Sequence, residues 1–126
     1  MAGEPLPDAV RAFVLKYVDS VAELEALLLV RSHAESGWDV PTLAARLYIR
    51  EAEAGAVLHA LHRRALVSRD GGNYRYDPKP IALRAEVDAL AHAYPGFLIP
   101  ITNVIHTKPR ASLRDFADAF RLREEK

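Results

Sequence analysis

The sequence predicts a mainly α-helical protein that carries one small β-hairpin. Most of the chain repeats apolar residues three and four positions apart, which is the spacing of an amphipathic helix. Between residues 66 and 77 the pattern changes to the alternation of half-buried strands, on the two sides of Gly71-Gly72-Asn73. These three residues supply the backbone freedom that a tight hairpin turn requires. Because an isolated hairpin is marginally stable in water, we expect it to pack against neighbouring helices.

The first two helices are marked by residues that favour helix ends. Pro7 suits the first turn of a helix, because its φ is already close to the helical value. Ser20, followed three residues later by Glu23, forms a capping-box pattern, so a second helix should begin there. We expect this helix to run to about Ser36 and to end at Gly37, a residue free to adopt a positive φ.

An extended segment and two further helices are expected before the hairpin. Trp38-Asp39-Val40 reads as a brief strand or an extended linker. Pro41-Thr42 opens a compact helix over residues 43–47, and a turn at Tyr48-Ile49-Arg50 leads into a helix of about fourteen residues. The inward positions of this longer helix are predicted to be Ala54, Val57, Leu58 and Leu61.

Residues 42–76, TLAARLYIREAEAGAVLHALHRRALVSRDGGNYRY, resemble the winged helix-turn-helix of bacterial regulators of the MarR and PadR kind. In those proteins an alanine in the first helix allows close helix crossing, and Ala44 or Ala45 stands in that place. An apolar residue anchors the turn, as Ile49 would. A closing Leu-Val pair leads from the recognition helix into the wing, as Leu66-Val67 would.

The resemblance implies a mainly α fold with a small β-hairpin wing, that is, a winged helix-turn-helix plus additional C-terminal helices. The recognition helix would occupy about residues 51–64 and the wing about residues 66–77. Trp38-Asp39-Val40 could supply the third strand of the wing. Residues 1–79 would form the winged helix-turn-helix domain.

Residues 80–126 would form a C-terminal helical extension that packs on the core or makes a dimer interface. Residues 80–94 are apolar at helical spacing, with Ile81 and Val87 among the positions expected to face inward, and Pro95-Gly96 breaks the pattern. Residues 97–105 follow as an apolar segment.

A last amphipathic helix is expected over residues 112–123. Its apolar stripe contains Leu113, Phe116 and Phe120, and we expect residues 80–122, which include this stripe, to form part of a two-fold homodimer interface. Alternatively the stripe binds a helix of another protein.

The resemblance also implies a DNA-binding surface. In a DNA-binding winged helix the first two turns of the recognition helix enter the major groove, and the wing lies along phosphates or in the minor groove. Basic residues that could bind phosphates surround both elements, namely Arg46, Arg50, Arg63, Arg64, Arg69 and Arg75. The residues expected to contact double-stranded DNA are Arg46, Arg50, Ala52, Glu53, Ala56, Arg63, Arg69, Asn73 and Arg75.

Two acidic residues leave an alternative open. Glu51 and Glu53 would repel phosphates, although a carboxylate can accept a hydrogen bond from cytosine N4. Acids in a first turn also complement the helix dipole without any DNA, and arginines on an exposed helix are typical of a solvated face. Two functions follow: a DNA-binding transcriptional regulator, and alternatively a winged-helix adaptor that binds another protein and no DNA.

The composition excludes several other classes. Lysine plus arginine and aspartate plus glutamate number 17 each, so any nucleic-acid surface must be local. The sequence has no cysteine, which removes disulfides, thiolate catalysis and the usual structural zinc sites. The start of the chain does not resemble a signal peptide, and the longest apolar stretch, residues 26–30, is too short to span a bilayer. We therefore expect a cytoplasmic protein without a membrane partner.

No catalytic motif is visible. The chain has no nucleophile elbow, phosphate-binding loop or dinucleotide fingerprint. His59 and His62 lie three residues apart on one predicted helix, but no acid or cysteine accompanies them at ligand spacing. We expect no enzymatic activity, no cofactor and no metal.

Overall fold

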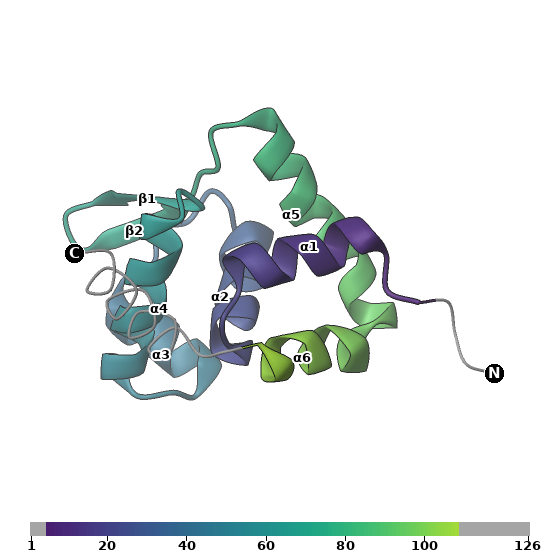
Figure 1. Ribbon diagram of the computed structural model, residues 1–126. Helices are drawn as coiled ribbons and strands as arrows, with labels where there is room; N and C mark the ends of the chain where they lie inside the picture. Colours follow the sequence, from purple (N-terminus) through teal and green to yellow (C-terminus); the bar gives the residue numbers. More distant parts are fainter. Residues whose placement is uncertain (1–4, 109–126) are drawn as a thin grey trace, which may run out of the picture.

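The structure, a computed structural model, describes residues 5–108 (Figure 1). Within this range it is mainly helical and contains one antiparallel pair of strands, which confirms the coarse prediction of an α-rich protein with a hairpin. The elements are α1 (Asp8–Tyr17), α2 (Val21–Ser32), α3 (Val40–Leu47), α4 (Glu51–Arg63), β1 (Val67–Asp70), β2 (Asn73–Tyr76), α5 (Ile81–Ala93), the short 3-10 helix η1 (Tyr94–Gly96) and α6 (Leu98–Thr107).

The helices form two groups around α2 (Figure 1). One group contains α3, α4 and the hairpin, and α2 packs against α4, α3 and β2. The other contains α5 and α6, which both pack against α1. A single apolar core runs through both groups, and an ion pair of 2.9 Å between Arg31 and Asp88 joins α2 to α5. Residues 80–108 thus pack on the same core as residues 5–79, while the division into domains at residue 79 stays a prediction.

Side-chain caps determine where α2 and α3 begin. The amide of Glu23 donates to Ser20 Oγ at 3.1 Å, as the capping-box pattern predicts, and the Glu23 carboxylate accepts from the amide of Asp19 at 2.9 Å. Asp39 Oδ1 accepts from the amide of Thr42 at 2.9 Å, so α3 begins at Val40. Hydrogen bonds from Thr42 lower the pKa of the Asp39 carboxyl. The expected brief strand or extended linker over Trp38-Asp39-Val40 is therefore wrong at Val40, which belongs to α3.

The predicted end of α2 is wrong. The helix stops at Ser32, whose hydroxyl donates to the Leu29 carbonyl at 2.8 Å, and not near Ser36. Gly37 has no positive φ and lies beside the Asn73 side chain. Beyond Ser32 the chain turns and brings Trp38 into a bridge with Tyr74 of the hairpin.

Trp38 extends the hairpin by one bridge. Its amide donates to the Tyr74 carbonyl at 2.7 Å, and its carbonyl accepts from the Tyr74 amide at 2.8 Å. β2 therefore lies between β1 and this residue. The turn of the hairpin is Gly71 and Gly72, with Gly71 at φ +62°, while Asn73 already pairs with Asp70 as the first residue of β2.

Both α3 and α4 end on a residue with left-handed backbone that is not glycine. Tyr48 follows α3 at φ +57°, and Ala65 follows Arg64, the C-cap of α4, at φ +63°. In each case the next amide reaches the carbonyl five residues earlier: the amide of Ile49 lies 3.1 Å from the Ala44 carbonyl, and that of Leu66 lies 3.0 Å from the Leu61 carbonyl. Glycine is the usual residue at such helix ends because a Cβ is strained there.

Replacing Ala65 by glycine is expected to raise the free energy of unfolding by about 1 kcal/mol, because the strain of a left-handed Cβ is removed. Chemical denaturation measures this change. Ala85 is exposed within α5, where glycine should lower stability by about 1 kcal/mol. Equal losses of stability in Ala65→Gly and Ala85→Gly would mean that the backbone at Ala65 is not strained.

The C-terminal part follows the predicted spacing with one clear exception. Val87 is buried as expected, but Ile81 is 86% exposed at the first turn of α5, so its expected inward position is wrong. The break at Pro95-Gly96 lies in η1, and residues of the apolar segment after it form α6. The predicted stripe of Leu113, Phe116 and Phe120 lies outside the described residues. Among residues 5–108 no helix is long and apolar enough to cross a membrane.

Candidate nucleic-acid interface

Along the exposed face of α4, opposite its buried residues, runs one stripe of outward side chains. The predicted inward positions of α4 are all buried, as is Ala60. The residues left outward at three-and-four spacing are Ala52, Ala56, His59 and Arg63. The first two turns of this stripe carry only methyl groups, so another molecule could approach the α4 backbone closely there. A methyl group can contact thymine in the major groove but reads no hydrogen-bond pattern.

The two glutamates of α4 lie beside this stripe. Glu53 lines an open cleft of about 670 Å³ together with residues 19–23 of the α1–α2 corner and with Ile105, His106 and Lys108 at the end of α6. It is therefore directed toward α2 and α6 and away from the hairpin. Arg50, the residue before α4, makes no side-chain hydrogen bond to the first turn of the helix. Glu51 and Glu53 lie in that turn, where their negative charge complements the positive end of the helix dipole. The structure does not bring Glu53 together with the hairpin residues predicted at the DNA.

The two arginines of the hairpin lie on opposite faces. Arg69 pairs with Tyr74 in the β1–β2 register, and partners directly opposite share a face of the sheet. Tyr74 is buried and meets the ring of His62 on α4 edge-on, with 6.2 Å between ring centroids, so Arg69 lies on the helix-facing side. Arg75 pairs with Ser68 and lies on the other side.

Arg69 and Arg46 lie over the two aromatic rings of this sheet row. The Arg69 guanidinium sits 5.8 Å from the centre of the Tyr74 ring, and its Nε donates to the Gly71 carbonyl at 2.8 Å. The Arg46 guanidinium sits 5.4 Å from the centre of a ring of Trp38, the bridge partner of Tyr74. These cation–π contacts favour positions of both side chains close to the hairpin.

The outer face of the hairpin forms a second open cleft, of about 520 Å³. Arg75, Asn73 and Asp70 line it, with Gly37 and Ser68. Of the predicted DNA-binding residues, Asn73 and Arg75 are brought together here, apart from Arg69.

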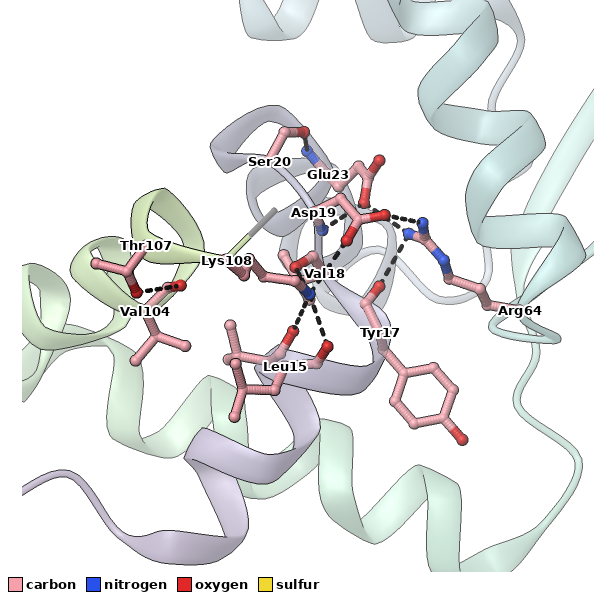
Figure 2. A network of polar contacts seen from close by, with 11 residues as sticks. Leu15, Tyr17, Val18, Asp19, Ser20, Glu23, Arg64, Val104, Thr107 and Lys108 are labelled. Atoms are coloured by element: carbon pink, nitrogen blue, oxygen red, sulfur yellow. Dashed lines mark hydrogen bonds and ion pairs between the residues drawn. The ribbon is translucent and has the colours of Figure 1, made fainter. Parts of the chain in front are cut away.

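Arg64 does not belong to this surface, and its place among the basic residues around the groove is wrong. Figure 2 shows its guanidinium turned toward the α1–α2 corner, where Nη2 lies 2.7 Å from Asp19 Oδ2 and Nη1 lies 2.6 Å from Glu23 Oε1. Nη1 also donates to the Tyr17 carbonyl at 2.9 Å. Lys108 reaches the same corner, with Nζ 3.1 Å from Asp19 Oδ1. Two carboxylates draw Arg64 inward, and these partners lie more than forty positions away along the chain.

The remaining arginines are exposed and form no ion pair with another residue of the described range. They are Arg46, Arg50, Arg63, Arg69 and Arg75. Residues 46–76 contain these five exposed arginines and three exposed acids, Glu51, Glu53 and Asp70. The region is therefore locally basic on a chain whose formal net charge is zero.

No family model, curated protein or solved structure matches this chain.

The histidines of α4 do not gather further metal ligands in the described part of the chain. No three side chains of histidine, cysteine, aspartate or glutamate within residues 5–108 lie close enough to hold a metal ion. His59 is exposed on α4, and His62 lies against the Tyr74 ring.

Proposed function

We propose that this chain is a DNA-binding regulator of winged helix-turn-helix type, with α4 as the recognition helix and the hairpin as the wing. The order of elements supports this: α2, an extended bridge at Trp38, α3, α4, β1 and β2. The pairing of Trp38 with β2 is what a third strand of the wing would do. The single observation that carries the DNA-binding proposal is the set of five exposed arginines, free of ion pairs with described residues, around α4 and the hairpin.

The chemistry of such a surface suits the phosphate backbone. Arginines supply charge-assisted hydrogen bonds to phosphate and release counterions, a term that does not depend on base sequence. Arg69 and Arg75 on opposite faces of the hairpin would reach the two phosphate strands that flank a minor groove entered by the wing. Ala52 and Ala56 would let α4 lie deep in the major groove. Sequence preference would then come from few side chains.

Alanine at Arg50, Arg69 or Arg75 is expected to weaken duplex binding by roughly tenfold and to reduce the slope of log affinity against log salt by about one per residue. Fluorescence anisotropy with a labelled duplex at about 50 and 200 mM salt measures both quantities. Arg11→Ala, the same change at an exposed position of α1, is the matched control and should leave binding unchanged. Absent or salt-insensitive binding by the unaltered chain would remove the proposal.

A protein-binding role is the second candidate, and the acids of α4 favour it. Glu51 and Glu53 flank a stripe of small side chains, a surface against which a partner helix could pack. This adaptor would show no duplex affinity. It would co-purify with a partner protein whose binding also needs the predicted C-terminal apolar residues Leu113, Phe116 and Phe120. Self-association through that stripe stays a prediction, as does the cytoplasmic location.

A further inference from the structure

We propose that Tyr48 contacts the DNA directly, its phenol donating a hydrogen bond to a phosphate oxygen. This inference rests on the proposed DNA-binding function and adds a contact residue to the set predicted from the sequence. Tyr48 lies in the turn between α3 and α4, two positions after Arg46 and two positions before Arg50.

The first observation is the exposure of the Tyr48 ring. Tyr48 is 94% exposed and makes no side-chain hydrogen bond, ring contact or cation–π contact with the described residues. The other four tyrosines of the chain are buried or half-buried: Tyr17, Tyr74, Tyr76 and Tyr94. Packing in the described fold therefore gives no reason for an aromatic side chain at this position.

The second observation is the backbone of Tyr48, at φ +57°. A bulky residue is rarely found in this left-handed region, which glycine occupies without strain, as Gly71 does at φ +62°. Ala65 ends α4 in the same conformation with only a methyl group. Tyr48 thus lowers stability through strain and gains no packing in return. Strain at an exposed, unpacked residue is typical of a position kept for binding.

The third observation concerns the neighbours of Tyr48. Arg46 and Arg50 are exposed, two positions before and two positions after it in the chain, and form no ion pair with a described residue. Because the Arg46 guanidinium lies over the Trp38 ring, Arg50 is the residue that would hold a phosphate close to the turn in the proposed complex. Tyrosine hydroxyls are among the groups that bind DNA phosphates, and they position the protein without reading the sequence. Because the phenol is uncharged, its contact releases no counterion.

Three variants test this inference, each measured for thermal stability and for binding to the same labelled duplex. Tyr48→Phe removes only the hydroxyl and should weaken binding by about five- to tenfold, with an unchanged salt slope and midpoint of thermal unfolding. Tyr48→Gly should weaken binding equally while raising the unfolding midpoint by about 2–4 °C. Ala65→Gly is the matched control, which should raise the midpoint and leave binding unchanged.

The outcomes separate this inference from the proposed function. If both Tyr48 variants bind as the unaltered chain does while Arg50→Ala weakens binding, the Tyr48 contact is wrong and DNA binding stands. If Tyr48→Gly binds more weakly and Tyr48→Phe binds as the unaltered chain does, the phosphate contact is also wrong. In that case the aromatic ring, and not the hydroxyl, would contribute to DNA binding. If the unaltered chain binds no duplex, the function itself fails.

Discussion

Replacing Arg64 by leucine is expected to lower the free energy of unfolding by about 3–5 kcal/mol, because it leaves the shielded Glu23 carboxylate without its cation and Asp19 with Lys108 alone. The Arg64 side chain is 15% exposed, and those of Asp19 and Glu23 are 6% and 13% exposed. Leucine keeps part of the volume but none of the hydrogen bonds, so the corner would retain buried negative charge.

The control for this prediction is the preceding residue. Arg63 is exposed at the end of α4 and forms no ion pair with a described residue, so Arg63→Leu should change stability by less than about 0.5 kcal/mol. Chemical denaturation of both variants gives the comparison. Equal, small losses for the two arginines would mean that the corner contributes no more than a surface ion pair.

The Arg64 corner also matters for the proposed function, because it fixes the end of α4. Asp19 lies between the cations of Arg64 and Lys108, which come from α4 and from the end of α6 (Figure 2). Lys108 Nζ also donates to the carbonyls of Val14, Leu15 and Val18, 3.0, 2.7 and 2.7 Å away, at the end of α1. Helix α4 is thus held by charged side chains that lie outside the proposed DNA-binding surface. If an Arg64 variant bound DNA more weakly, the cause would be the lower stability of the fold and not the loss of a contact between Arg64 and DNA.

Local patterns in the sequence predicted the elements that carry the candidate site. The buried row of α4 follows from apolar spacing, and the hairpin follows from the change of period around Gly71-Gly72. The capping box at Ser20 was likewise predicted, since its two partners lie three residues apart. These features depend on neighbours in the chain, which a single sequence displays.

The misses concern contacts between distant segments. The early end of α2 serves the pairing of Trp38 with Tyr74, and the inward turn of Arg64 depends on carboxylates from another helix corner. The opposite directions of Arg69 and Arg75 depend on the register of the hairpin. Tyr48 was expected in the turn but not among the DNA-contacting residues, and its left-handed backbone was missed because glycine is the usual signal of that conformation and the sequence has tyrosine there.

Replacing Ile101 by alanine is expected to lower the free energy of unfolding by about 2–5 kcal/mol and to destabilise the hairpin side as well. Ile101 is fully buried in α6, which packs on α1, and the core is continuous from there to Trp38. Trp38 is the single tryptophan, so its fluorescence reports on the α3 and hairpin side, while circular dichroism reports on all helices. In one cooperative unit both signals should shift together.

Ile99 provides the matched control for this experiment. It lies two positions earlier on α6 and is 70% exposed, so Ile99→Ala should shift neither signal by more than about 0.5 kcal/mol. If Ile101→Ala moves the circular dichroism transition and leaves the Trp38 transition in place, residues from 80 onward unfold separately, as a division at residue 79 would require. Coincident shifts would instead mean that α4 and the hairpin depend on α5 and α6 for their stability. In that case α5 and α6 must be kept in any fragment used to measure DNA binding.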